Sequence, residues 1–343
     1  MKRRTFIASS AVLAGGAITG APLAFGQAKL KTTKVSVAVG GKNLFYSTTC
    51  RSRSPSAAIT SRTKGSTSKS PTSRAAKGVA GGGRRQRGCL VSAAFEHTLL
   101  LQAKNQFFRE FVLQGRAPQI VLAVSKKAMP NYKSVADLKG KKIGVTAPGL
   151  STSIMASFVL AQAGLKATDV SFIGVGAIAA LESGQIDAIA NLDPVMTKLD
   201  RAGEIRIVSD TRTLADTKKV FGGNMLAGCL YASQSFITKN PNTTQALTNA
   251  MVRALKWLQN ASGKDLISTV PEGYLLGDRA LYLDLWQHVK EALSSDGLMP
   301  DDGPATSLKT LQAFDETVKG KPIDLSKTWT NDFVKKALAT VKA

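Results

Sequence analysis

Between residues 119 and 208, hydrophobic patterns typical of strands alternate along the chain with patterns typical of helices. Short apolar or alternating runs are typical of buried strands, whereas apolar residues spaced by three or four positions are typical of helices. The predicted strands cover residues 119–125, 141–149, 169–176, 186–192 and 204–209. The helices predicted between them cover residues 134–140, 151–163 and 177–183. This alternation predicts a parallel sheet with helices on both faces.

Further elements are predicted on either side of this block. Residues 34–39 alternate in the manner of a strand, and residues 98–107 predict a helix. Residues 224–233 predict a strand that returns to the first part of the chain. The remaining residues are mainly helical in pattern, with predicted helices at 243–258, 281–293, 305–314 and 332–341.

The first 28 residues have the layout of an export signal. A basic start with the pair Arg3-Arg4 precedes a weakly apolar, glycine-containing stretch, and small residues follow near Ala28. The arginine pair favours the twin-arginine route, with an ordinary secretory signal as the alternative. We therefore expect the mature protein to be soluble and periplasmic.

The net charge of +23, from 46 Lys and Arg against 23 Asp and Glu, would suit a nucleic-acid partner. The excess is local, however. Three basic residues lie in the predicted signal, and ten lie between Arg51 and Arg87, where no acidic residue occurs. Without them the remaining chain carries +10. We therefore expect no nucleic-acid partner.

Residues 47–90 show neither hydrophobic period and hold two of the three cysteines. A basic disordered arm, a disordered linker and translation out of frame are the three interpretations. Permissible codons for residues 48–77, shifted by one nucleotide, can spell an amphipathic helix and an alternating strand, and a shifted stretch at 83–89 continues smoothly into the following residues. We favour out-of-frame translation and expect this segment to be disordered as written.

No set of residues typical of an enzyme active site is evident. The chain has two histidines, His97 and His288, and Cys229 lies within an apolar run. No metal-ligand spacing occurs, and the glycines at 174–184 lack the full dinucleotide fingerprint. We expect no metal, no cofactor and no catalytic residue.

The residues best suited to ligand binding follow predicted strands, where ligands of open α/β sheets bind. Ser151, Thr152 and Ser153 begin a predicted helix, whose free N–H groups and hydroxyls suit a polar or anionic ligand. Simple helix capping explains the same residues. The other candidates at such junctions are Glu96, His97, Asn191 and Asp193.

Several ordered motifs resemble a known family. They include AFEHTLLLQAK, FVLQGRAPQIVLAVS, VADLKGKKIGVTAPGLSTS, SGQIDAIANLDPV and ALTNAMVRALKWLQ. Together they resemble the substrate-binding proteins of ABC transporters of the nitrate/sulfonate/taurine type, whose relatives include binders of thiamine-pyrimidine precursors. The resemblance covers residues 34–46 and 91–325.

The resemblance implies an α/β fold of two lobes, the type II periplasmic-binding-protein fold, each lobe a mostly parallel sheet flanked by helices. The first lobe would comprise residues 29–121 plus 226–343, and the second residues 122–225. The ligand cleft would be lined by Phe45, Tyr46 and the candidates above. The implied partners are a small solute, a membrane permease and its ATPase, and the protein would be a monomer.

Three other functions are compatible with parts of the sequence. Pyrimidine-precursor synthases share the family and are enzymes, but the export signal and the sparse catalytic inventory favour a non-enzymatic binder. A sensor subunit and a non-functional frameshifted product are further alternatives. Because Glu96 and Asp193 would repel a simple anion in the cleft, we expect an organic ligand with amine or amide character.

Overall fold

The computed structural model describes residues 37–39, 90–175, 178–270, 272–275 and 278–341. The predicted export signal, residues 47–89 and the predicted binding residues Phe45 and Tyr46 lie outside the described residues. Across the part of the chain that the structure describes, no helix has the length and apolar character needed to span a membrane.

The middle of the chain forms a five-stranded sheet in the order β6-β5-β7-β4-β8. Its strands are β4 (Ile120–Ser125), β5 (Lys142–Gly144), β6 (Ser171–Ile173), β7 (Ala188–Leu192) and β8 (Ile205–Asp210). The predicted strands are thus present, and the sheet is mostly rather than wholly parallel. Strand β4 is antiparallel to both β7 and β8, whereas β5 is parallel to β6 and β7.

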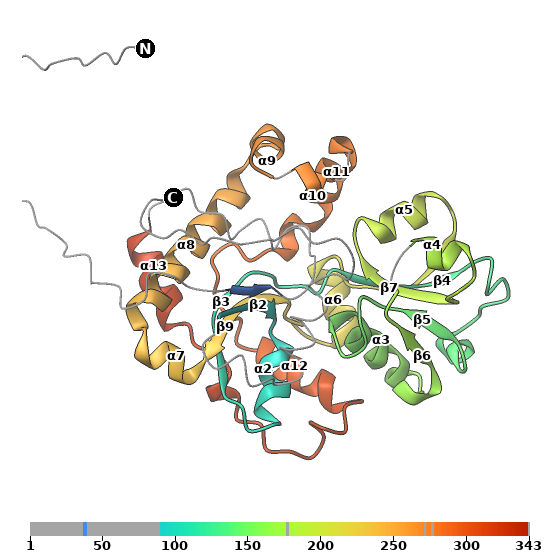
Figure 1. Cartoon of the computed structure of the whole chain (residues 1–343), viewed down its shortest axis with the longest axis horizontal. Coiled ribbons are helices and arrows are strands. Elements are labelled where there is room, and N and C mark those ends of the chain that lie inside the picture. The colour runs from blue at the N-terminus through green and yellow to red at the C-terminus, as the bar shows by residue number, and fades with distance from the viewer. Residues whose placement is uncertain (1–36, 40–89, 176–177, 271, 276–277, 342–343) are drawn as a thin grey trace, which may run out of the picture.

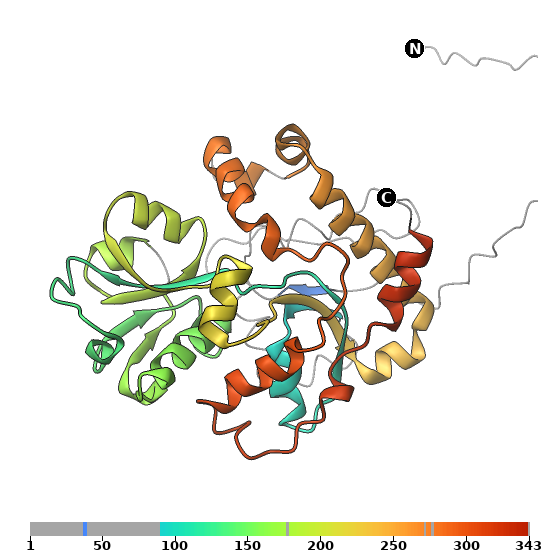
Figure 2. The same ribbon diagram turned by 180° about the vertical axis from the view of Figure 1, so that it is seen from behind.

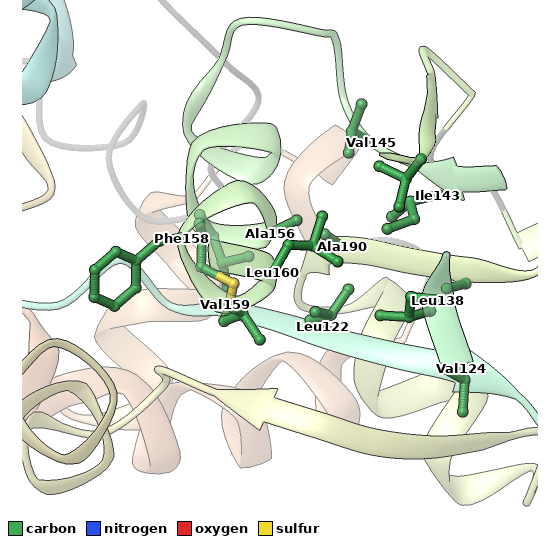
Figure 3. Close-up of a cluster of buried hydrophobic side chains, with 14 of the residues drawn as sticks. Leu122, Val124, Leu138, Ile143, Val145, Ala156, Phe158, Val159, Leu160 and Ala190 are labelled. Atoms are coloured by element: carbon green, nitrogen blue, oxygen red, sulfur yellow. The ribbon is translucent and has the colours of Figure 1, made fainter. Parts of the chain in front are cut away.

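Helices cover both faces of this sheet, because strand β4 buries side chains in both directions. Leu122 and Val124 of β4 point into one apolar cluster, and Val121 and Ala123 point into another. Figure 3 shows the first cluster, in which α3 packs on the sheet. The helices are α3 (Ser151–Gln162), α4 (Ile178–Glu182), α5 (Val195–Arg201) and α6 (Leu214–Phe221).

A second sheet combines strands from before and after the middle part of the chain, in the order β1-β2-β9-β3. Its strands are β1 (Val37–Val39), β2 (Leu90–Ala94), β3 (Phe108–Leu113) and β9 (Gly228–Ser233). Strand β9 is antiparallel to β2 and β3, and β1 is parallel to β2. The helix predicted at 98–107 begins and ends earlier, as α2 (Glu96–Gln102), because β3 follows within a few residues.

Most helices after β9 gather around this second sheet, as Figures 1 and 2 show. They are α7 (Gln234–Lys239), α8 (Pro241–Asn260), α9 (Gly263–Thr269), α10 (Glu272–Leu275), α11 (Arg279–Val289), α12 (Gly303–Gln312) and α13 (Asp332–Thr340). We call the sheet containing β9, with its helices, the first lobe, and the sheet containing β4, with its helices, the second lobe.

The chain passes between the lobes twice, and the two crossings lie side by side. The backbone N–H of Gln114 donates to Gly228 O at 2.8 Å, and the N–H of Ala227 donates to Gly115 O at 3.1 Å. Each crossing continues as the antiparallel strand of the sheet that it enters, β4 or β9. The parallel strands beside them therefore end where those strands begin, with Leu192 opposite Ile120 and Ala94 opposite Gly228. In both lobes, the carboxyl ends of the parallel strands face the other lobe.

The two sheets share one pairing scheme. The order β1-β2-β9-β3 repeats the order β5-β7-β4-β8, with the same parallel and antiparallel neighbours at each step. The second lobe adds β6 outside β5, whereas the described residues of the first lobe include no strand outside β1. Helices α3 and α4 and strand β6 arise between β5 and β7, and residues 40–89 occupy the same place in the chain order of the first lobe.

Candidate functional site

Glu96 lies at the junction between the lobes, as the first residue of α2 directly after β2. Its side chain is almost fully buried, with 2% of the residue exposed. Oε1 accepts a hydrogen bond of 2.6 Å from the hydroxyl of Ser151, which begins α3 in the second lobe. Oε2 is buried and has no hydrogen-bond partner among the described residues. One carboxylate therefore joins the lobes while keeping one oxygen without a donor.

His97 is buried beside Glu96 and does not carry a charge. Its Nδ1 lies 3.4 Å from the hydroxyl of Tyr231, and its Nε2 has no partner among the described residues. Burial lowers the pKa of His97, and the neighbouring Glu96 carboxylate offsets this only in part. A neutral imidazole can either donate or accept one hydrogen bond at Nε2, depending on its tautomer.

The start of α3 is built by a tight loop that follows β5. Gly149 has a φ of 81°, a left-handed conformation that favours glycine, and its N–H donates to the Ser153 hydroxyl at 2.8 Å. The Thr152 hydroxyl lies 3.1 Å from the backbone N and 2.8 Å from the hydroxyl of Thr146. The side chains of Thr152 and Ser153 thus hold the loop against the helix, while Ser151 reaches the other lobe.

Asn191 lies near the end of β7, and Asp193 follows that strand. The Asn191 side-chain oxygen accepts from the N–H of Leu192 at 2.8 Å. Asp193 Oδ1 accepts from the backbone N–H of Thr197 at 2.9 Å and from its hydroxyl at 2.7 Å. Asp193 therefore holds the first turn of α5, which is the capping role of such a residue.

Arg212 belongs to the same cluster, and the sequence interpretation missed it. Its guanidinium pairs with Asp210 at 2.6 Å and with Asp193 at 3.5 Å. Burial lowers the pKa of Arg212, but the hydrogen bond to Asp210 and the two carboxylate charges outweigh burial and raise the pKa. No sequence motif marked Arg212, because its pairing with Asp193 is formed only when the chain folds.

Two further polar contacts join the lobes. Arg201 of α5 forms an ion pair with Asp284 of α11, and both side chains are exposed. Glu291 accepts a hydrogen bond of 2.9 Å from the backbone N–H of Leu214, which begins α6. Together with the Glu96–Ser151 contact, they bring the second lobe against the first on more than one side.

A buried acidic group lies on β3 beneath this junction. Glu110 is 1% exposed, and neither carboxyl oxygen has a hydrogen-bond partner among the described residues. Burial raises the pKa of Glu110 well above its ordinary range, which favours the protonated form of the group. Burial also raises the pKa of Cys229 and of Tyr231 well above their ordinary values, with a further contribution from the Glu96 charge.

Cys229 and the junction differ from an activated nucleophile and from a metal site. A nucleophilic cysteine needs a lowered pKa and access to solvent, whereas Cys229 is fully buried and its pKa is raised. Among the described residues, no group of three His, Cys, Asp or Glu side chains could hold a metal ion. The junction instead offers one unpaired carboxylate oxygen, one unpaired imidazole nitrogen and the start of a helix.

Comparison with solved structures identifies the fold. A protein of Bordetella bronchiseptica RB50 is 51% identical, with 91% of this chain and 99% of that chain covered and a TM-score of 0.79. The periplasmic sulfonate-binding protein SsuA of a putative sulfonate ABC transporter from Methylobacillus flagellatus KT is 21% identical, with 77% of each chain covered and a TM-score of 0.54. The desulfurization enzyme DSZB is 16% identical, with 75% of this chain and 87% of that chain covered and a TM-score of 0.50.

The fold is therefore that of the type II periplasmic binding proteins, as the sequence motifs indicated. Residues 116–262 match the family model described as NMT1/THI5 like. The chain belongs to this family, and its resemblance to ABC-transporter substrate-binding proteins of the nitrate/sulfonate/taurine type is confirmed. No curated protein matches the chain.

The buried Glu110 predicts a pH-dependent stability. Because its pKa is raised in the folded state, the unfolded chain loses this proton first as pH rises above the ordinary glutamate pKa. The contribution of Glu110 to the free energy of unfolding therefore falls with rising pH until the folded-state pKa is passed. Glu110→Gln should remove this term, so the variant gains stability relative to the parent as pH rises above the ordinary glutamate pKa. Urea titrations at a series of pH values measure the difference.

Glu182 provides a matched control because it is an exposed glutamate on α4. Glu182→Gln should leave the pH profile of the parent within about 0.5 kcal/mol. A constant difference between Glu110→Gln and the parent across the pH series would show that Glu110 does not titrate differently in the folded state.

Asp193 is expected to contribute to stability through α5. Asp193→Ala removes the acceptor for two Thr197 donors and should cost about 1–2 kcal/mol in the free energy of unfolding. Asp193→Asn keeps an acceptor oxygen and should lose less. Asp200→Ala, at an exposed position of the same helix, is the control and should change stability by less than about 0.5 kcal/mol. An Asp193→Ala variant as stable as the control would remove Asp193 from the helix cap.

Proposed function

We propose that the chain is the extracytoplasmic solute-binding component of an ABC importer, which captures a small organic or anionic solute between its lobes and delivers it to a membrane permease. The observation that carries this proposal is the 2.6 Å hydrogen bond from Ser151 to Glu96. It brings together two strand-end helices from different lobes, at the place where open α/β sheets bind their ligands.

The start of α3 supports a polar ligand at this junction. The backbone N–H groups of Ser151 and Thr152 have no hydrogen-bond partner among the described residues. Such groups at a helix start attract polar and anionic groups. A solute that bound them and Glu96 together would stabilise the state in which the lobes touch, which is a hinge closure around a ligand.

The proposal has further parts that rest on the family and the sequence. The first lobe comprises residues 29–121 plus 226–343, and the second residues 122–225. Residues 1–28 direct export to the periplasm, where the mature chain acts as a soluble monomer. It meets the permease directly and depends on a cytoplasmic ATPase for transport. The sequence-predicted binding residues, including Phe45 and Tyr46, belong to the solute site.

An enzyme of the same family is the second candidate. It is favoured by the shared fold of the desulfurization enzyme DSZB. The neutral, fully buried Cys229 and the buried, uncharged His97 speak against it, because neither is disposed as an activated nucleophile or an accessible base. Chemical conversion of a solute by the purified chain would show that the protein is an enzyme and not only a solute-binding protein.

A frameshifted, non-functional product is the third candidate. It is favoured by residues 47–90, which show neither hydrophobic period and contain no acidic residue. We predict that resequencing the coding DNA across residues 46–91 restores a frame encoding a helix, an edge strand and a second helix. A confirmed basic segment would mean a decayed gene or a real insertion.

The solute-binding proposal is tested on the chain encoded by the verified DNA. Native mass spectrometry of the exported protein should show one small molecule bound per chain, released unchanged on denaturation. Adding that molecule back at 100 times its Kd should stabilise the fold by about 2.7 kcal/mol, measured by thermal unfolding.

Two variants separate the junction from the rest of the surface. Arg201→Ala removes an ion pair between the lobes, and should weaken solute binding because it disfavours the closed state. Arg279→Ala removes the exposed Arg279–Glu272 pair within the first lobe and should leave binding unchanged. Release of a chemically altered molecule, or no binding by a folded chain, would contradict the proposal.

A further inference from the structure

The two oxygens of the Glu96 carboxylate are in different situations. Oε1 accepts the Ser151 hydroxyl across the junction at 2.6 Å. Oε2 is shielded from solvent and has no donor among the described residues. Buried carboxylates in folded proteins are normally paired or fully hydrogen-bonded, because an unpaired one loses its hydration without compensation. The exception at Glu96 therefore indicates a donor that arrives in another state of the protein.

The described surroundings offer Glu96 no cation. None of the ion pairs of the described residues includes Glu96. Its neighbour His97 is uncharged, and its Nε2 is likewise buried without a partner. The Glu96 charge acts on Cys229 and Tyr231, which cannot neutralise it. The carboxylate is thus an acceptor of hydrogen bonds that still requires a positive or N–H partner.

We infer that the ligand presents an N–H donor, as an amine, amidine, amide or amino-substituted ring, to Oε2 of Glu96. The inference rests on the proposed solute-binding function and names the chemical class of its solute. A ligand that is only an oxyanion, such as nitrate or an alkanesulfonate, is disfavoured. The Glu96 carboxylate already lies against the residue that begins α3, so a second anion placed there would meet a like charge.

The same carboxylate couples recognition to closure. Oε2 meets the ligand, while Oε1 holds the hydroxyl of the opposite lobe. A donor that fixes the carboxylate in place also orients the acceptor that Ser151 needs. Ligand binding at Glu96 and contact between the lobes therefore favour each other, without requiring a ligand that touches every part of both lobes.

The experiment screens the verified chain by thermal shift against two sets of solutes of matched size. One set carries N–H donors, as alkylamines, amidines, amides and aminopyrimidines; the other holds nitrate, alkanesulfonates and carboxylates without N–H groups. We expect stabilising solutes only in the first set. Stabilisation confined to the second set would overturn the inference while the solute-binding function stands. A folded chain stabilised by neither set would count against both.

Variants then test Glu96 itself by calorimetry with the best solute. Glu96→Gln keeps an oxygen for the Ser151 hydroxyl but removes the charge. The affinity for a solute with an N–H donor should fall by at least about 30-fold. The variant should at the same time improve binding of an alkanesulfonate, a change of selectivity that a structural defect would not produce. Ser151→Ala, the matched control on the other side of the bond, should weaken both classes equally. Equal losses for both classes in Glu96→Gln would overturn the inference.

Discussion

The two crossings of the chain, each made by an antiparallel strand, set the geometry on which the rest of the structure depends. Strand β4 enters the second lobe and β9 returns to the first, and each lies between two strands that run the other way. Backbone hydrogen bonding of an antiparallel pair places the end of one strand beside the start of the other. The parallel strands of both lobes must therefore end at the junction, and the helices that follow them must begin there.

This constraint explains why buried polar groups gather at one place. Helices α2 and α3 begin at strand ends that face each other, so Glu96 and Ser151 meet across the junction. The Glu96 oxygen without a donor and the buried carboxyl group of Glu110 cost stability that an apolar core would not. Such conflicts with the local rules of packing are typical of functional sites, and here they lie at the junction where we propose that the solute binds.

The sequence predicted the periodic elements well, because the buried strands and helices of the second lobe carry strong patterns. It placed the start of α3 at Ser151 and the junction of β2 and α2 at Glu96, as the structure has them. It missed the sense of β4, since an apolar run such as 119–125 has no pattern that distinguishes parallel from antiparallel pairing. It also missed β3, whose two charged residues in FREFVL interrupt the apolar run.

The candidate site was harder to predict, because capping and ligand binding use the same residue types. Thr152, Ser153 and Asp193 were selected for hydroxyls and a carboxylate at strand ends, and each of these groups makes hydrogen bonds within its own lobe. Arg212 was not predicted as a site residue, because its part in the cluster depends on ion pairs with Asp193 and Asp210 that form only in the folded chain.

Glu96 and Asp193 show what the structure adds. Each lies at a junction from a strand to a helix, β2 to α2 for Glu96 and β7 to α5 for Asp193. The two junctions occupy equivalent places in the two lobes. Asp193 is satisfied locally by Thr197 and Arg212. Glu96 reaches across the junction with one oxygen and leaves the other without a donor. Because local partners already account for Asp193, the requirement for an outside donor falls on Glu96, and recognition of the solute is expected to begin in the first lobe.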